Sequence, residues 1–159
     1  MLQTHPILSR FGVDVTGIDL TRLDEAEFEA LYALWIEYGV LRVREQRMDQ
    51  AQLQRFSARF GPLEEIPYGR ISEADKAKIA NRYVTVISNI VENGKPIGGL
   101  GSHEASWHSD MTYKEIPPPA SVLLGVEVPQ ASGDTYFADQ YAAYDALPEA
   151  LKTRVAQLS

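Results

Sequence analysis

The hydrophobic and polar positions of the chain follow a helical pattern first and a strand-like pattern later. After a short predicted strand at residues 12–18, Asp24 is expected to begin a helix, with Glu27 in capping-box position three residues later. The apolar side chains that follow recur at helical spacing and form one stripe, and Gly39 ends the helix. The stripe consists of Phe28, Leu31, Trp35 and Tyr38.

A strand and a second helix are predicted next. Residues 40–44 alternate as a half-buried strand does, with Leu41 and Val43 on one face. A helix is then expected from Asp49 to just before Gly61, and its periodic spacing predicts a core role for its apolar face. That face consists of Leu53, Phe56 and Phe60.

The second half of the chain is predicted to consist mainly of strands. β-Branched content predicts a strand at 84–90, and similar patterns predict strands at 121–128 and 135–138, followed by a helical tail from 141 onwards. Four glycines within residues 93–106 predict a mobile loop, which is either a lid or a plain surface connection. Helices followed by strands indicate the α+β class.

Composition excludes several classes of function. The 159 residues predict a single domain, 1–159, of a soluble protein with net charge -7 and 45% hydrophobic residues. Without cysteine there is no disulfide scaffold, thiolate zinc site or cysteine nucleophile. The absence of a basic cluster argues against nucleic-acid binding, and no apolar stretch approaches the roughly 20 residues of a membrane span. We therefore expect a cytoplasmic protein without a membrane or nucleic-acid partner, and a homo-oligomer is compatible with the sequence.

The segment Trp107-His108-Ser109-Asp110 carries the candidate chemistry. His108 and Asp110 are two residues apart, so on an extended strand both side chains would emerge on the same face. An imidazole and a carboxylate are two thirds of the 2-His-1-carboxylate set that holds non-haem Fe(II). An isolated triplet of this kind is, however, more often a hydrogen-bonded or surface pair.

A third metal ligand is not evident. The other histidines are His5 and His103, and none follows Asp110. His103 is a weak alternative, because two ligands near one glycine-rich loop would fix the geometry of a metal poorly. We therefore expect half of an iron site, in a chain that resembles the first part of an incomplete domain.

Several segments match one known pattern in colinear order. They are Gly17–Thr21, residues 40–46, Arg59-Phe60-Gly61, Trp107–Tyr113, Pro117–Ala120, residues 132–135 and residues 141–147. Together they resemble the taurine dioxygenase/TfdA-like family of Fe(II)- and 2-oxoglutarate-dependent dioxygenases, with the whole chain corresponding to about the N-terminal half of a member. The resemblance implies a double-stranded β-helix (jelly-roll) with flanking helices.

The same resemblance implies roles for individual residues. His108 and Asp110 would be metal ligands for Fe(II), Thr135 would contact a carboxylate of the cosubstrate 2-oxoglutarate, and Met111 would line the substrate pocket. With O2, the family couples oxidative decarboxylation of 2-oxoglutarate to hydroxylation of a small organic substrate. The family's distal histidine and its 2-oxoglutarate-binding arginine have no counterpart here, so we expect the chain alone to bind iron weakly and to be inactive.

Two further expectations concern function. Glu64, Glu65 and Glu104 stand where the taurine enzyme holds its substrate, and their charges would repel a sulfonate, so taurine is not the expected substrate. The alternative function is that of a non-catalytic short paralogue, acting as a binding or interaction module. In that case His108 and Asp110 would be hydrogen-bonded structural residues.

Overall fold

The fold was taken from a computed structural model, which describes residues 2–65, 81–100, 106–131 and 133–158. The chain forms two compact units, the first of residues 1–46 with 127–159 and the second of residues 47–126. The described residues form both helices and small sheets, which agrees with the predicted mixture of α and β structure. The double-stranded β-helix remains a prediction.

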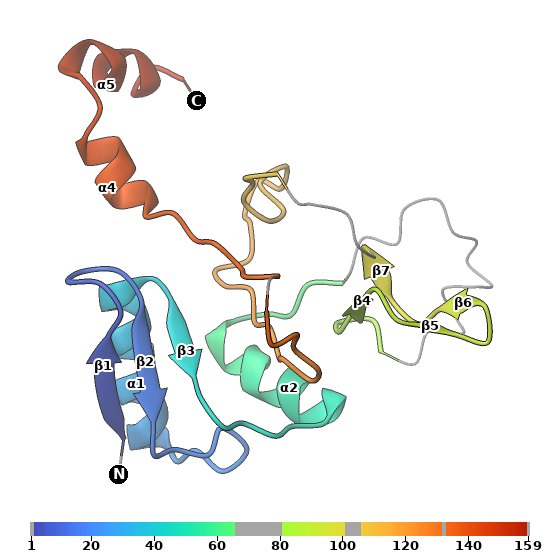
Figure 1. Cartoon of the computed structure of the whole chain (residues 1–159). Helices are drawn as coiled ribbons and strands as arrows, with labels where there is room; N and C mark the ends of the chain where they lie inside the picture. Colours follow the sequence, from blue (N-terminus) through green and yellow to red (C-terminus); the bar gives the residue numbers. More distant parts are fainter. Residues whose placement is uncertain (1, 66–80, 101–105, 132, 159) are drawn as a thin grey trace. The chain divides into compact units, whose positions relative to one another are not determined.

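The first unit contains a three-stranded sheet in the order β1-β2-β3 (Figure 1). β1 (Gln3–Pro6) is antiparallel to β2 (Val13–Thr16), and β2 is parallel to β3 (Leu41–Val43). β2 and β3 lie within the predicted strands. β1 was not predicted, because all four of its residues are exposed and no alternation of apolar side chains marks it.

Helix α1 (Glu25–Tyr38) connects the parallel strands β2 and β3, as such a connection requires. Its N-terminus is the predicted capping box: the Asp24 carboxylate accepts from the Glu27 N–H at 2.8 Å, and the Glu27 carboxylate accepts from the Asp24 N–H at 3.2 Å. The helix ends at Gly39, also as predicted. Half of its stripe, Phe28 and Leu31, is buried. The core of this unit consists of Val13, Val15, Leu20, Phe28 and Leu31, while Trp35 and Tyr38 are half-buried.

A bidentate ion pair joins β2 to β3 on the solvent side of the sheet. Asp14 and Arg42 face each other in the parallel register, and the guanidinium donates to both carboxylate oxygens at 2.5 and 2.6 Å. This hydrogen bonding is the largest cause that lowers the pKa of Asp14, and burial opposes it. The positive charges of Arg42 and Arg44 lower that pKa further.

The ion pair predicts a pH dependence of stability. Because the folded-state pKa of Asp14 is depressed, its contribution is present above the unfolded-state pKa of about 3.9 and is lost as the pH falls through the folded-state value. Asp14→Asn is expected to lower the free energy of unfolding at pH 7 by roughly 0.2–1 kcal/mol, as for exposed pairs. Denaturant titrations at pH 7 and below pH 4 check this, and Asp145→Asn on α4 is the control. An equal effect at both pH values would contradict it.

The second unit begins with the predicted helix α2 (Gln50–Ser57). The Asp49 carboxylate accepts from the Gln52 N–H at 2.7 Å, and the Gln52 amide oxygen accepts from the Asp49 N–H at 2.8 Å, which completes a second capping box. The chain continues as the 3-10 turn η1 (Ala58–Phe60) and leaves it at Gly61, whose φ of 152° favours glycine. Leu53 and Phe56 are buried, as expected.

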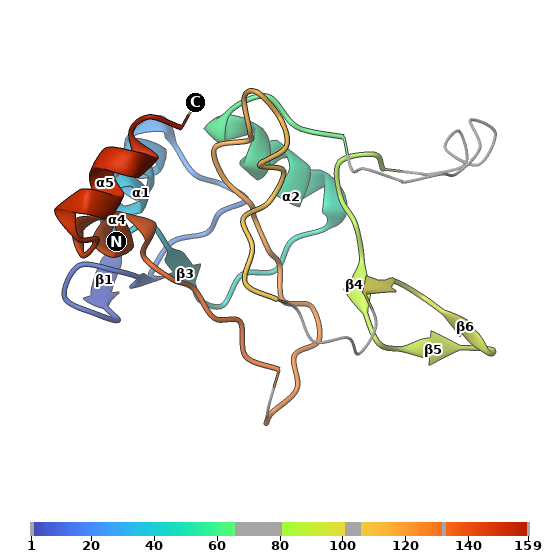
Figure 2. The ribbon, with the colours of Figure 1, turned by 90° about the horizontal axis from the view of Figure 1, so that it is seen from above.

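Four short strands follow in the described residues of this unit (Figures 1 and 2). β4 (Ile87–Ser88) pairs in parallel with β7 (Gly99–Leu100), and β5 (Val91–Glu92) forms an antiparallel hairpin with β6 (Lys95–Pro96). The predicted strand 84–90 is thus reduced to two residues.

The prediction of a loop from residue 93 is wrong for residues 95–96 and 99–100, which form strands. Asn93 and Gly94 have φ of 50° and 76°, and such a pair of positive values is typical of a two-residue hairpin turn. Residues 101–105 lie outside the described residues, and so does the alternative ligand His103.

The predicted strands 121–128 and 135–138 are irregular in the structure. The side chains of the first segment still alternate, with Val122 and Leu124 half-buried and Ser121 and Leu123 exposed. A strand, however, also needs a neighbouring chain to pair its backbone groups. The alternation in the sequence predicts which side chains are buried, but it does not indicate whether a second strand is available for pairing.

The predicted helical tail consists of two separate helices, α4 (Gln140–Asp145) and α5 (Glu149–Val155). Pro148 divides them, because it lacks an N–H and its ring would clash with the carbonyl four residues earlier in a continuous helix. In the part of the chain that the structure describes, no helix has the length and apolar character needed to cross a membrane.

Candidate metal centre

The candidate metal ligands lie in an irregular segment rather than on a strand. Residues 110–113 form a turn, in which the Lys114 N–H donates to the Met111 carbonyl at 3.0 Å. The prediction that His108 and Asp110 share one face of a strand is therefore wrong for the backbone. Their side chains nevertheless meet.

Three contacts define the geometry of this cluster. His108 Nε2 lies 3.2 Å from Asp110 Oδ1, and His108 Nδ1 lies 2.7 Å from the Ser106 carbonyl oxygen. The Ser121 hydroxyl donates to Asp110 Oδ2 at 2.7 Å. The side chains of His108 and Asp110 are 62% and 56% exposed, so an ion from solvent can reach both.

The surroundings of His108 raise the pKa of its imidazole above the ordinary value. The hydrogen bond to the Ser106 carbonyl is the largest cause, and the negative charge of Asp110 adds to it. Because a carbonyl only accepts, it is Nδ1 that carries the proton in the neutral ring. Nε2 is then left with its lone pair toward the Asp110 carboxylate.

The donor atoms present fit a divalent first-row metal ion. A metal-binding histidine commonly donates its second ring N–H to a backbone carbonyl, as His108 does to Ser106. With ligand distances of about 2.1 Å, two ligands at right angles lie about 3.0 Å apart, close to the 3.2 Å between Nε2 and Oδ1. Within the described ranges, no cluster of three His, Cys, Asp or Glu side chains occurs.

Two contacts attach the segment to residues 61–64, which follow η1. Lys114 Nζ forms an ion pair with Glu64 Oε2, and Pro119 lies beside Gly61, where an added Cβ would be 3.5 Å from Pro119 Cγ. Both anchors are in the same unit as the cluster.

The ion pairs also change the expectation about a sulfonate. Glu64 is paired with Lys114, and Glu65 lies 3.6 Å from Arg82, so both carboxylates are balanced by cations. Glu104 lies outside the described residues. The argument that these acidic residues repel a sulfonate therefore loses two of its three charges.

The other two predicted site residues have different positions. Met111 directly follows the candidate ligand and is half-buried, with a φ of 51° that is uncommon for a residue other than glycine. Thr135 is exposed, in the irregular segment before α4, and belongs to the first unit. The structure thus brings the side chains of His108 and Asp110 together, with Met111 next in the sequence, whereas Thr135 belongs to the other unit.

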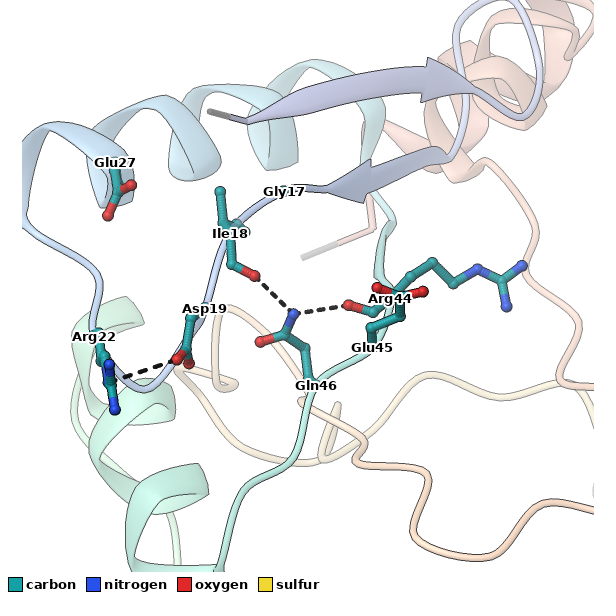
Figure 3. A pocket seen from close by; sticks show the side chains of 8 residues that line it. All are labelled: Gly17, Ile18, Asp19, Arg22, Glu27, Arg44, Glu45 and Gln46. Atoms are coloured by element: carbon teal, nitrogen blue, oxygen red, sulfur yellow. Dashed lines mark hydrogen bonds and ion pairs between the residues drawn. The ribbon is translucent and has the colours of Figure 1, made fainter.

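A polar pocket of about 380 Å³ in the first unit was not predicted (Figure 3). It is lined by Gly17, Ile18, Asp19, Arg22, Glu27, Arg44, Glu45 and Gln46. The Gln46 amide donates to the Ile18 and Arg44 carbonyls at 3.0 and 2.7 Å and accepts from the Leu20 N–H at 2.9 Å. Gln46 therefore joins the two matching segments 17–21 and 40–46, a role that their joint presence in the sequence could have suggested.

The comparison with protein families decides the relationship. Residues 3–159 match the family described as "Taurine catabolism dioxygenase TauD, TfdA family". The chain belongs to the TauD/TfdA family. The resemblance inferred from the motif segments is thereby confirmed, and it extends over nearly all of the chain.

Curated relatives are identical to this chain at about a third of the aligned residues. (S)-Phenoxypropionate/alpha-ketoglutarate-dioxygenases of Sphingobium herbicidovorans and Delftia acidovorans are 35% and 34% identical over 96% and 99% of the chain. An alpha-ketoglutarate-dependent sulfate ester dioxygenase of Pseudomonas putida is 31% identical over 95%. The matches cover 50%, 53% and 46% of these relatives, so the chain spans about half their length.

Proposed function

We propose that the protein is an Fe(II)- and 2-oxoglutarate-dependent dioxygenase that acts on a small organic acid or ester. The observation that carries the proposal is the contact of His108 Nε2 with Asp110 Oδ1, with Nδ1 engaged by the Ser106 carbonyl. Membership of the TauD/TfdA family supports it, since its named relatives use alpha-ketoglutarate, which is 2-oxoglutarate. The corresponding fold is a double-stranded β-helix.

The roles follow from the chemistry of each side chain. His108 and Asp110 would hold Fe(II), which when bound supplies the centre at which 2-oxoglutarate and O2 react. Thr135 is exposed and lies outside any helix or strand. Its hydroxyl would donate a charge-assisted hydrogen bond to a 2-oxoglutarate carboxylate. Met111 would contribute an adaptable apolar surface to the substrate pocket, next to the metal ligands.

The substrate class is proposed from the relatives. Their names specify phenoxypropionate and sulfate esters, which are small organic anions. We extend this class to the present protein, because Glu64 and Glu65 are each paired with a cation and would repel an anion only weakly. The cytoplasmic location and the absence of membrane and nucleic-acid partners remain predictions of the sequence.

Succinate formation tests the proposal. Protein expressed from the complete gene is expected to form succinate from 2-oxoglutarate, dependent on Fe(II), O2 and a phenoxyalkanoate or sulfate ester. Residues 1–159 alone are expected to bind Fe(II) weakly and to form none, because two side-chain ligands hold the ion poorly.

Two results would contradict these expectations. Succinate formation by residues 1–159 that is lost in His108→Ala would refute their inactivity. Absence of both Fe(II) binding and turnover in the complete protein would refute the dioxygenase proposal and favour the non-catalytic module, in which the contact of His108 with Asp110 is purely structural.

A further inference from the structure

The carboxylate of Asp110 has two oxygens with different partners. Oδ1 faces His108 Nε2 at 3.2 Å, whereas Oδ2 accepts the Ser121 hydroxyl at 2.7 Å. A carboxylate can bind a metal through one oxygen or through both, and a hydrogen bond to one oxygen occupies one of its two lone pairs and orients the group, which disfavours a second coordination bond. The two oxygens of Asp110 are therefore not equivalent.

We propose that Ser121 is the positioning residue that makes Asp110 a one-oxygen metal ligand, with Oδ1 coordinating and Oδ2 held by the Ser121 hydroxyl. The inference rests on the proposed function, because it concerns the same metal site. Coordination through one oxygen uses a single position of the ion. It thereby leaves one more position open for 2-oxoglutarate and O2 than coordination through both oxygens would.

The segment between Asp110 and Ser121 has a restricted backbone, which favours this hydrogen bond. It contains three consecutive prolines, Pro117 to Pro119, whose rings fix φ and restrict the segment before any contact forms. Pro119 lies beside Gly61, and Lys114, in the same segment as Pro119, pairs with Glu64. Ser121 thus lies two residues after Pro119. Little conformational entropy of the chain is therefore lost when the Ser121 hydroxyl hydrogen-bonds to Asp110.

Ser121 is also suited to this role by its exposure. Its residue and Asp110 are both exposed, so the hydroxyl does not serve to satisfy a buried group. Removing it should leave the packing of the unit intact. An effect of the substitution on metal binding would then report on Asp110 rather than on the fold.

The test measures Mn(II) binding to the 159-residue chain by electron paramagnetic resonance, with infrared difference spectra of the Mn(II)-bound and metal-free protein. Ser121→Ala is expected to weaken Mn(II) binding about tenfold, as for loss of a group that orients a ligand. It should also narrow the separation of the two carboxylate stretching bands, which marks a change from one-oxygen to two-oxygen coordination. Ser121→Thr keeps the hydroxyl and should show the Mn(II) affinity and band separation of the wild type. Asp110→Asn removes the carboxylate and thereby identifies its stretching bands.

Ser109→Ala is the matched control, since Ser109 lies in the same exposed segment and the structure gives its hydroxyl no hydrogen bond. Unchanged affinity and unchanged bands in Ser121→Ala, with normal binding by the wild type, would overturn the role of Ser121 alone. Equal losses in Ser109→Ala and Ser121→Ala would also overturn it. Absence of Mn(II) binding by the wild type, even at Mn(II) concentrations high enough to detect weak binding, would refute the metal site in this chain and the role of Ser121 with it.

Discussion

Replacing His108 with alanine is expected to weaken Fe(II) binding by more than about 100-fold, to below detection for residues 1–159. The substitution removes the one imidazole of the cluster, and even groups that merely orient a ligand contribute 10- to 100-fold to affinity. Anaerobic titration with Fe(II) measures the change. His5→Ala is the control, because His5 is an exposed histidine on β1 in the other unit.

The same titration has an expected dependence on pH. Fe(II) needs the neutral imidazole and competes with the proton, and the pKa of His108 is raised by the Ser106 carbonyl and by Asp110. Fe(II) binding should therefore strengthen as the pH rises through a value above about 6.5, the ordinary pKa of histidine. Binding that is independent of pH between 5 and 8, or lost equally in His5→Ala, would show that His108 does not bind the ion.

Replacing Leu31 with alanine is expected to lower the free energy of unfolding of the first unit by about 2–5 kcal/mol. Leu31 is the largest fully buried side chain of the chain that the structure describes, and its truncation leaves a cavity among tightly packed neighbours. The other buried hydrophobic residues of the first unit are Val13, Val15, Leu20 and Phe28.

Trp35 allows the effect of Leu31→Ala to be measured. It lies one turn after Leu31 on the same helix, and the only other tryptophan of the sequence is Trp107. Denaturant unfolding followed by fluorescence in a Trp107→Phe background therefore reports on the first unit. Ile36→Ala, at a residue 64% exposed on α1, should change the free energy by less than about 0.5 kcal/mol. Equal effects of the two substitutions would show that the sheet and α1 do not form a stable core.

The two long helices show what local sequence can predict. The capping box of Asp24 and the helix start at Asp49 both form as predicted, and Gln52 completes a second capping box that was not predicted. The energy of these features comes from side chains and backbone groups within one turn. The start of each helix can therefore be predicted from the sequence alone, and it was predicted for both helices.

The strands show where such prediction ends. β2 and β3 were found from their alternation, but β1 carries no apolar pattern and was recognised only from its pairing with β2. Conversely, residues 121–128 alternate and yet form no strand. Whether an alternating segment becomes a strand depends on a partner distant in sequence, since half of its stabilising contacts belong to the other chain segment.

The sequence by itself determined the family, the capped helices and the identity of the candidate ligands, because each of these depends on residue types at short, fixed spacing. Only the tertiary structure showed that the side chains of His108 and Asp110 meet and that Glu64 and Glu65 each have a cationic partner. It also showed that the Ser106 carbonyl contacts His108 Nδ1 and that the Ser121 hydroxyl donates to Asp110 Oδ2. These contacts join residues up to 50 positions apart. Their distances follow from how the chain folds back on itself, which no local pattern encodes.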